Sequence, residues 1–257
     1  MPTPSLQVYI LTFCRDAEQL YGTTLIFKTL RVGFPNARVV VVDNASLPEV
    51  RNEIRAHARD VGATHMQLAQ AIPHHIFIER TLVAGQASRM VFLDPDICFW
   101  KSVETWSFDE LIAGRLMPEH RDYSTDCTVQ PRLHTSFLWF DNVRKLLETM
   151  DRIRKFYYEV DLFKSTMLPF HQGWIRYDTC GVLYNAIRRS THAFVEDELD
   201  CYDHLFCGTH IARVAPNLAP RLREFFENSH ELAKTNYSAL RGLWRLQEEY
   251  FRVMTTG

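Results

Sequence analysis

The feature that most constrains the fold is an alternation of short apolar runs with helix-period segments over the first hundred residues. Residues 38–42 read Arg-Val-Val-Val-Val, which is typical of a central parallel strand covered on both faces. Similar short runs at residues 6–12, 64–68 and 90–93 predict three more strands. Parallel strands need long crossover connections, which helices usually supply. The chain is therefore expected to begin as an α/β fold.

Three segments between these strands carry apolar residues at intervals of three or four, which indicates amphipathic helices. They cover residues 16–32, 48–61 and 73–83, with Asp16 expected as the first N-cap and a proline at the start of the other two. Strands that alternate with such helices predict right-handed crossovers. The expected core is a central, mainly parallel sheet with helices on both faces.

After residue 100 the pattern is less regular. The polar stretch 119–132 is expected to be a loop or flap outside the core, and 170–177 an irregular aromatic segment. The last forty residues are read as two helices joined near Asn236. The other elements expected here are strands at 134–140 and 193–196 and helices at 142–159 and 179–189. No repeat or Gly/Ser linker is present, so a single domain is expected.

Composition narrows the classes of function. The 257 residues carry 29 Lys+Arg and 31 Asp+Glu, so a net charge of -2 provides no whole-chain field for nucleic acid or an anionic membrane. No apolar run approaches the roughly 18 residues that a membrane span needs. Residues 1–7 lack a basic segment followed by an apolar one, which predicts a cytoplasmic protein without a signal peptide. Six cysteines without a CxxC pair are expected to be reduced thiols.

Acidic residues follow three of the predicted strands. In an open parallel sheet, ligands bind beyond the carboxyl ends of the strands, which here carry residues 12–16, 43–46 and 94–96. Clustered carboxylates repel one another unless a cation or a hydrogen-bonding ligand lies between them. Pro95 interrupts the strand, so Asp94 and Asp96 can converge on a hard ion such as Mg²⁺ or Mn²⁺, which also binds phosphate oxygens.

These residues carry a resemblance to a known family. The segments are Ile10-Leu-Thr-Phe-Cys-Arg-Asp16, Val39-Val-Val-Val-Asp-Asn-Ala-Ser46 and Phe92-Leu-Asp-Pro-Asp96. In order and spacing they resemble the nucleotide-binding half of GT-A fold glycosyltransferases near family 2, with the last segment as the DxD motif. The resemblance implies a single GT-A domain over 1–257. Its parts would be a nucleotide-sugar-binding half (1–100), an acceptor and catalytic half (101–220) and C-terminal helices (221–257).

The resemblance also implies roles for individual residues. Asp94 would lie near the ribose and the metal, and Asp96 would bind the metal directly. The residues that would lie against the nucleotide are Thr12, Arg15, Asp43, Asn44 and Ser46, with Asp43 accepting from the nucleobase. Two plainer interpretations stay open: residues 43–46 could form a capped turn, and Asp94 and Asp96 could be surface carboxylates.

The second half matches more loosely. Residues 134–141 resemble the strand that lines the acceptor side, and Trp174-Ile-Arg-Tyr-Asp-Thr-Cys-Gly181 resembles the segment that carries an acidic base. An inverting transfer needs a carboxylate within reach of the acceptor hydroxyl, and Asp178 is the first candidate. Asp178 is equally suited to cap a helix beginning at Cys180. Glu196 and Asp197 are the second candidates for the base.

A late histidine segment, His204-Leu-Phe-Cys-Gly-Thr209, resembles the loop that completes the metal and pyrophosphate site. It would supply His204 as a nitrogen ligand, with His210 in reserve, and the backbone N–H groups of Gly208 and Thr209 for phosphate oxygens. Either histidine could instead be buried against a carbonyl group. A zinc site is a rival interpretation because four potential ligands fall at intervals of three: Cys201, His204, Cys207 and His210. Ten residues leave little chain to build a tetrahedron, which argues against zinc.

Taken together, the acidic strand ends and the family resemblance imply a metal-dependent, inverting glycosyltransferase of polysaccharide biosynthesis. Its donor would be a nucleoside-diphosphate sugar with UDP as the first choice, its cofactor Mn²⁺ or Mg²⁺, and its acceptor a glycan or another hydroxyl compound. Nucleic acid is not expected as a partner. An inactive relative that only binds nucleotide sugar remains the alternative. Four aromatic residues could stack on sugar rings, with Trp174 the best candidate: Trp100, Trp139, Phe170 and Trp174. For the apolar C-terminal residues 222–246, core packing, a homo-oligomer interface and contact with a membrane surface stay open.

Overall fold

The computed structural model describes residues 6–15, 17–122, 125–156, 160–170, 173–204 and Asn228. The chain divides into two compact units, each named here after one of its strands. The β2 unit comprises Tyr9–Ala71, Asp94–Trp106 and the described part of Glu196–Gly257, and the β9 unit comprises Ile72–Leu93, Ser107–Val195 and the described residues before Tyr9. The chain enters each unit more than once, so the units do not coincide with the expected halves at residue 100. The assignment of one domain over 1–257 stays a prediction.

The β2 unit holds the regular βα alternation that the sequence predicts. Its elements are β1 (Leu6–Thr12, from Tyr9 on), α1 (Ala17–Gly33), β2 (Arg38–Asp43), α2 (Pro48–Asp60), β3 (Thr64–Gln67), β5 (Ile97–Phe99), α6 (Glu196–Leu199) and β13 (Tyr202–His204). β2 and β3 pair in parallel, with Val40 opposite Thr64 and Asp43 opposite Gln67. The four valines of β2 are all buried, as expected for a strand with both faces covered.

The β9 unit contains the remaining elements. These are α3 (His74–Ala84), β4 (Arg89–Leu93), β6 (Ile112–Met117), β7 (His120–Asp122), β8 (Cys127–Val129), β9 (Arg132–Phe140), α4 (Val143–Phe156), β10 (Thr166–Phe170), β11 (Gly173–Tyr177), α5 (Gly181–Ile187), the short 3-10 helix η1 (Arg188–Ser190) and β12 (Thr191–Ala193). β9 pairs antiparallel with both β4 and β6, and β12 pairs in parallel with β6. Five consecutive residues at the end of β9, from Ser136 to Phe140, are buried.

The strand order of the seven-stranded central sheet is β12-β6-β9-β4-β1-β2-β3. A four-stranded sheet, β10-β11-β8-β7, and a two-stranded sheet, β13-β5, accompany it. The prediction of an α/β fold with a large, mainly parallel central sheet is therefore confirmed. The expected strands and helices of residues 6–93 are confirmed to within one or two residues.

Several predictions for the second half are wrong. Residues 119–132 are not simply a polar loop, because β7, β8 and the start of β9 lie there and Cys127 and Val129 are buried. Residues 170–177 are not irregular, since β10 and β11 form an antiparallel pair with Phe170 opposite Gly173. The strand expected at 193–196 ends at Ala193, and α6 begins at Glu196. β11 also pairs with β8, and β12 with β6, which are distant in the sequence, so long-range pairing contributes what the weak local preference does not.

Two further observations concern membrane-spanning helices and the state of the cysteines. None of the helices in the described part of the chain combines the length and the apolar character that crossing a bilayer requires. Five cysteines are described, and each is a buried thiol without a disulfide: Cys14, Cys98, Cys127, Cys180 and Cys201. Burial and a hydrogen bond with Thr29 act in opposite directions on the Cys98 thiol, and burial prevails, so its pKa is raised and it stays protonated.

Candidate metal centre and the neighbouring strand ends

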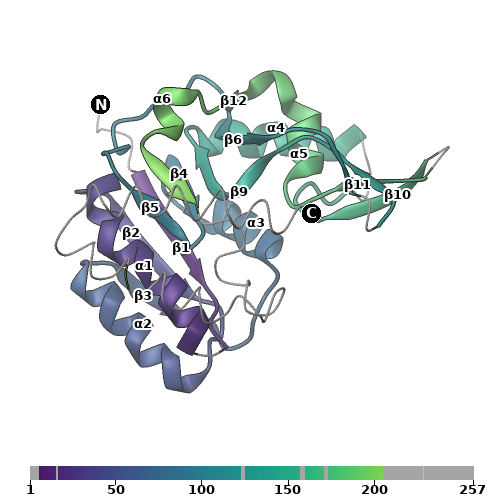
Figure 1. The fold of residues 1–257 in the computed structure, drawn as a ribbon. Coiled ribbons are helices and arrows are strands. Elements are labelled where there is room, and N and C mark those ends of the chain that lie inside the picture. The colour runs from purple at the N-terminus through teal and green to yellow at the C-terminus, as the bar shows by residue number, and fades with distance from the viewer. Residues whose placement is uncertain are drawn as a thin grey trace. The chain divides into compact units, whose positions relative to one another are not determined.

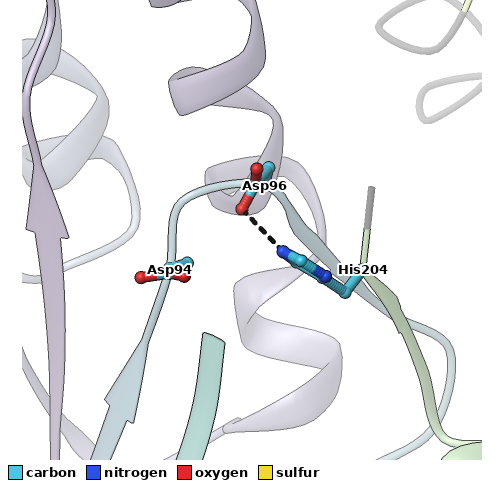
Figure 2. Close-up of side chains that lie close together, drawn as sticks. All are labelled: Asp94, Asp96 and His204. Atoms are coloured by element: carbon cyan, nitrogen blue, oxygen red, sulfur yellow. Dashed lines mark ion pairs between the residues drawn. The ribbon is translucent and has the colours of Figure 1, made fainter. Parts of the chain in front are cut away.

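Two carboxylates and one imidazole meet in the β2 unit, drawn from parts of the chain more than a hundred residues apart. Asp94 and Asp96 lie on the turn that precedes β5, and His204 is the last residue of β13 (Figure 2). β13 runs antiparallel to β5, with His204 opposite Ile97 and Tyr202 opposite Phe99. This register places the imidazole beside the turn, because Asp96 directly precedes Ile97.

The geometry of the cluster fits a hard divalent cation. Asp94, Asp96 and His204 each offer one ligand atom, and these atoms lie within 4.8 Å of one another. Asp96 is 4% exposed and His204 5%, so two of the three ligands are withdrawn from water. Carboxylate and imidazole groups both ligate divalent metals.

The contact between Asp96 and His204 adds a sharper test. Asp96 Oδ1 lies 3.3 Å from His204 Nε2, yet this buried oxygen accepts no hydrogen bond in the described structure. A buried carboxylate oxygen without a hydrogen bond is unfavourable unless another partner satisfies it. Adjacent ligand atoms of an octahedral ion with bonds of about 2.1 Å are about 3 Å apart. The two atoms therefore have the spacing of neighbouring ligands, which supports the fit.

Hydrogen bonds hold β13 in place beside β5. Asp203 Oδ2 accepts a hydrogen bond from Trp100 Nε1 at 2.5 Å, and the carbonyl of Cys201 accepts from the backbone N–H of Trp100 at 2.8 Å. Trp100 was expected to be a sugar-stacking candidate, but its indole N–H is directed at Asp203. Asp203 is not predictable from the sequence, because three residues (Tyr202, Asp203 and His204) are too short a pattern to predict a strand.

The segment after β2 forms a hydrogen-bonded turn. Asp43 Oδ1 accepts from the backbone N–H of Ser46 at 2.8 Å, and Ser46 Oγ accepts from the N–H of Cys14 at 2.9 Å. The N–H of Asn44 donates to the carbonyl of Thr12 at 2.8 Å. The turn thus joins the ends of β1 and β2. The capped-turn interpretation of residues 43–46 is correct, and it does not exclude a second role in nucleotide binding.

The second oxygen of Asp43, Oδ2, forms an ion pair with Arg51 Nε at 3.7 Å. The side chain is fully buried, and Oδ2 accepts no hydrogen bond among the described residues. Thr12 is also fully buried, with Oγ1 donating to the carbonyl of Val42 at 3.4 Å. Arg15 is exposed, and its guanidinium lies 4.5 Å from the centre of the Phe13 ring. Thr12, Arg15, Asp43, Asn44 and Ser46 therefore all lie at two adjoining strand ends, as predicted.

Arg51, Gln67 and His65 surround Asp43 and were missed from the sequence. Arg51 Nη2 donates to the carbonyl of Ser46 at 2.9 Å. With its amide oriented so that Oε1 faces Arg51, Gln67 accepts from Arg51 Nη1 at 2.8 Å. Burial lowers the pKa of His65, while the charge of Asp43 acts in the opposite direction. The parallel register that pairs Asp43 with Gln67 is the signal that could have found this residue.

The candidates for the catalytic base lie in different units. Asp178 belongs to the β9 unit, where Oδ2 forms an ion pair with Arg132 Nη2 at 2.8 Å and Oδ1 accepts from the N–H of Thr179 at 2.9 Å. The expected N-cap role is wrong, since Cys180 is the N-cap and α5 begins at Gly181. Glu196 and Asp197 are exposed in the first turn of α6 in the β2 unit.

Several predicted residues cannot be placed. Thr209, His210, Gly208 and Cys207 lie outside the described residues, as do the expected C-terminal helices. Of the four candidate zinc ligands, only Cys201 and His204 lie among the described residues. The Cys201 thiol donates to the carbonyl of Asp197 at 3.3 Å, and the ligand cluster of His204 is completed by carboxylates and not by Cys201. Trp139 is fully buried in the core, so it does not stack on a sugar, whereas Phe170 and Trp174 are exposed.

No family model and no curated protein matches this sequence. Solved structures similar in fold include the mannosyltransferase PcManGT from Pyrobaculum calidifontis in complex with GDP-Man and Mn²⁺ (12% identity, TM-score 0.47, 95% of this chain and 74% of that chain covered). A second is the glycosyltransferase GlyE of Streptococcus pneumoniae (10% identity, TM-score 0.46, 95% of this chain and 64% of that chain covered). A third is the galactosyltransferase LgtC (12% identity, TM-score 0.41, 73% of this chain and 72% of that chain covered). All three are glycosyltransferases. That is the class the sequence motifs resemble, but at these identities the activity of this chain has to be argued from its own residues.

Proposed function

We propose that this chain is a metal-dependent glycosyltransferase that transfers a sugar from a nucleoside-diphosphate sugar to a hydroxyl acceptor. The observation that carries the proposal is the cluster of Asp94, Asp96 and His204, with a buried Asp96 oxygen that accepts no hydrogen bond. These three residues would hold Mn²⁺ or Mg²⁺. When bound, the ion would supply Lewis acidity that neutralises the charge of the departing diphosphate.

The ends of β1 and β2 would bind the nucleotide. The remaining acceptor, Asp43 Oδ2, suits a ring N–H of a nucleobase, and uracil provides one such donor. The N–H of Ser46 donates to Asp43 Oδ1, and the N–H of Asn44 donates to the carbonyl of Thr12. These hydrogen bonds hold the Asp43 carboxylate in one orientation. UDP-sugar is accordingly our first choice of donor.

The chemistry further requires a base that takes the proton of the acceptor hydroxyl. We assign it first to Asp178, in an inverting transfer, and second to Glu196 or Asp197. The ion pair with Arg132 would keep the Asp178 carboxylate oriented, as second groups orient catalytic bases elsewhere. Asp178→Asn should reduce turnover by about 10²–10⁴-fold with little change in donor affinity, which is the usual contribution of a general base.

A nucleotide-sugar-binding protein without transfer activity is the second candidate. Both Asp178 oxygens already have partners, the N–H of Thr179 and the guanidinium of Arg132. A carboxylate whose two oxygens are both engaged is less available to take a proton, which favours this candidate. Donor hydrolysis in the presence of Mn²⁺ distinguishes the two, because enzymes of the proposed kind release the sugar to water when no acceptor is present and a binder does not.

The decisive experiment is a thermal-shift screen of UDP-, GDP-, CDP- and dTDP-sugars with and without Mn²⁺. A ligand that binds only the folded state raises the midpoint of thermal unfolding. At a ligand concentration of a hundred times its Kd, the free energy of unfolding increases by about 2.7 kcal/mol. We expect one donor to raise the midpoint in wild type with Mn²⁺, and the rise to be lost in Asp96→Asn but kept in Asp60→Asn, which changes an exposed carboxylate. The proposal fails if no donor and metal pair shifts the midpoint.

A further inference from the structure

One part of the β9 unit exposes an unusual concentration of large apolar side chains. Of the twelve exposed large hydrophobic residues in the described part of the chain, six fall between residues 156 and 174. They are Phe156, Val160, Met167, Leu168, Phe170 and Trp174, and together they are called here the 156–174 surface. Phe156 is 83% exposed and Phe170 64%. Scattered apolar residues are normal on a protein surface, but a local concentration marks an interaction site.

The arrangement on β10 shows what kind of partner fits. Met167, Leu168, Pro169 and Phe170 are consecutive and all exposed. β10 and β11 form an antiparallel pair (Figure 1). Because successive side chains of a strand point to opposite faces, the exposed residues of β10 place apolar groups on both faces of this pair. A folded protein partner would cover one face of such a pair. A lipid bilayer surrounds an inserted pair on every side.

Edge-to-edge pairing with a second copy is disfavoured by the sequence of β10. This strand lies at the edge of the four-stranded sheet β10-β11-β8-β7. Pro169 near its middle has no backbone N–H, and proline on an edge strand blocks the pairing of a further strand.

Two exposed lysines next to the surface can contact anionic lipid. The stretch 162–177 contains no Asp or Glu and residues 152–156 contain three cations and no acid, while Asp151, Glu159 and Asp161 flank these stretches. Two of the cations, Arg154 and Arg176, form ion pairs with Glu79 and Asp122. Lys155 and Lys164 are exposed. Basic residues beside an exposed apolar surface are attracted to anionic head groups, while Trp and Phe favour the boundary between head groups and acyl chains.

A cavity extends this surface into the unit. Its volume is about 780 Å³, and Val160 and Leu168 line it together with Ile153, Leu162 and Val182 and with polar residues that include Asp161, Lys164 and Asn185. Because Val160 and Leu168 belong both to the 156–174 surface and to the lining of the cavity, an acyl chain that meets the surface would find further apolar contact there.

From these observations we infer that the 156–174 surface docks the protein on a bilayer that contains anionic lipids, with β10 and β11 entering the head-group region. The inference does not depend on the proposed transfer reaction, since it concerns neither the metal ligands nor the strand ends of the β2 unit.

The test is co-sedimentation of the full chain with large unilamellar vesicles, either of phosphatidylcholine alone or with 30% phosphatidylglycerol, without metal or donor. Wild type should bind the anionic vesicles. The variant Leu168→Ser/Phe170→Ser/Trp174→Ser should bind them at least about tenfold more weakly, because three large apolar contacts are lost. The control Val83→Ser/Val195→Ser changes two apolar residues that are exposed elsewhere in the same unit and should bind as wild type does.

A second variant guards against loss of folding in the first. Lys155→Glu/Lys164→Glu leaves every apolar residue in place and should weaken binding to the anionic vesicles by at least about tenfold through repulsion of the head groups. The inference is overturned if wild type fails to bind anionic vesicles, or if the serine variant folds and binds them as wild type does. It is equally overturned if gel filtration shows that the serine substitutions only dissociate an oligomer while vesicle binding is kept, which would make the surface an interface between copies.

Discussion

Asp96, which we propose as a metal ligand, illustrates how such a role can oppose stability. It shares a small space with a second carboxylate, Asp94, and its buried Oδ1 accepts no hydrogen bond. Replacing it with Asn removes a charge but keeps the size, so without metal the midpoint of thermal unfolding should stay the same or rise. Loss of residues that only orient metal ligands costs about 10–100-fold in affinity, so loss of a ligand should weaken Mn²⁺ binding by at least about a hundredfold.

Titration of Mn²⁺ followed by calorimetry measures this change. Asp60→Asn, which alters an exposed carboxylate, is the matched control and should leave the affinity unchanged. A variant at Asp96 that binds Mn²⁺ as tightly as wild type would remove this residue from the metal site.

Asp141 shows the reverse case, a carboxylate whose hydrogen bonds favour its charged form and the folded state. Burial by itself raises its pKa, yet hydrogen bonds from three neighbours outweigh burial and the pKa lies below the ordinary value. The side-chain donors are Trp139 Nε1 at 3.0 Å, Arg89 Nε at 2.5 Å and Ser107 Oγ at 2.9 Å, and the backbone N–H of Phe108 also donates, at 3.1 Å. A pKa depressed by folding stabilises the protein above the unfolded-state value of 3.8, and this contribution is lost as the pH falls through the folded-state value.

The expected effect of Asp141→Asn follows from this sign. At pH 7 the variant should lose about 2 kcal/mol of unfolding free energy, the usual size for hydrogen bonds to a charged group. The difference from wild type should stay constant above about pH 5 and shrink below about pH 4. Urea unfolding across this pH range measures it, with the exposed Asp151→Asn as control. A difference independent of pH would show that the carboxylate charge does not contribute.

At the scale of elements, the end of α1 and β5 are packed closely. An added Cβ on Gly33, the last residue of α1, would lie 2.5 Å from Cγ of the fully buried Phe99 ring. Phe99 also packs edge-on against Phe34, at 5.2 Å between ring centres. The ring therefore has little room to move, and Gly33→Ala should cost about 1–3 kcal/mol through overpacking.

The same substitution at Gly181 provides the control. There an added Cβ would meet its nearest atom, Cβ of Tyr177, at 3.5 Å, which is ordinary contact at the start of α5. Gly181→Ala should be neutral or slightly stabilising because alanine restricts the unfolded chain. Thermal unfolding of the two variants side by side tests the packing, and equal midpoints would contradict it.

The helices and strands differ in how well they could be predicted from the sequence. The strands and helices of residues 6–93 were predictable because long runs of one periodicity alternate, as in the four valines of β2 and the buried Val50, Ile54 and Ala58 of α2. β5 and β13 were not predictable, since each has three residues and exists by pairing with the other. This pair is what brings His204 to Asp96, so the family resemblance identified the histidine while local patterns gave no reason for its position.

For the whole molecule, the division into two units leaves the number of domains open. It bears directly on the predicted boundary at residue 100, because it decides which fragments keep the packing partners of their strands. The predicted acceptor half, residues 101–220, omits α3 and β4 of the β9 unit. In the intact chain β4 pairs with β9 from Met90 opposite Phe140 to Leu93 opposite Phe137, and these four residues are buried. The half without β4 would expose that edge of β9.

We therefore expect the fragment 101–220 not to fold by itself. It loses the ion pair between Arg89 and Asp141, and the edge-on contact between Phe92 and Phe140 at 5.5 Å between ring centres. A fragment over 72–220 keeps both contacts and should show stronger near-ultraviolet circular dichroism and a cooperative urea transition, which 101–220 should lack. A cooperative transition in the shorter fragment would mean that β9 needs no partner from β4, and that a boundary at residue 100 is physically sound after all.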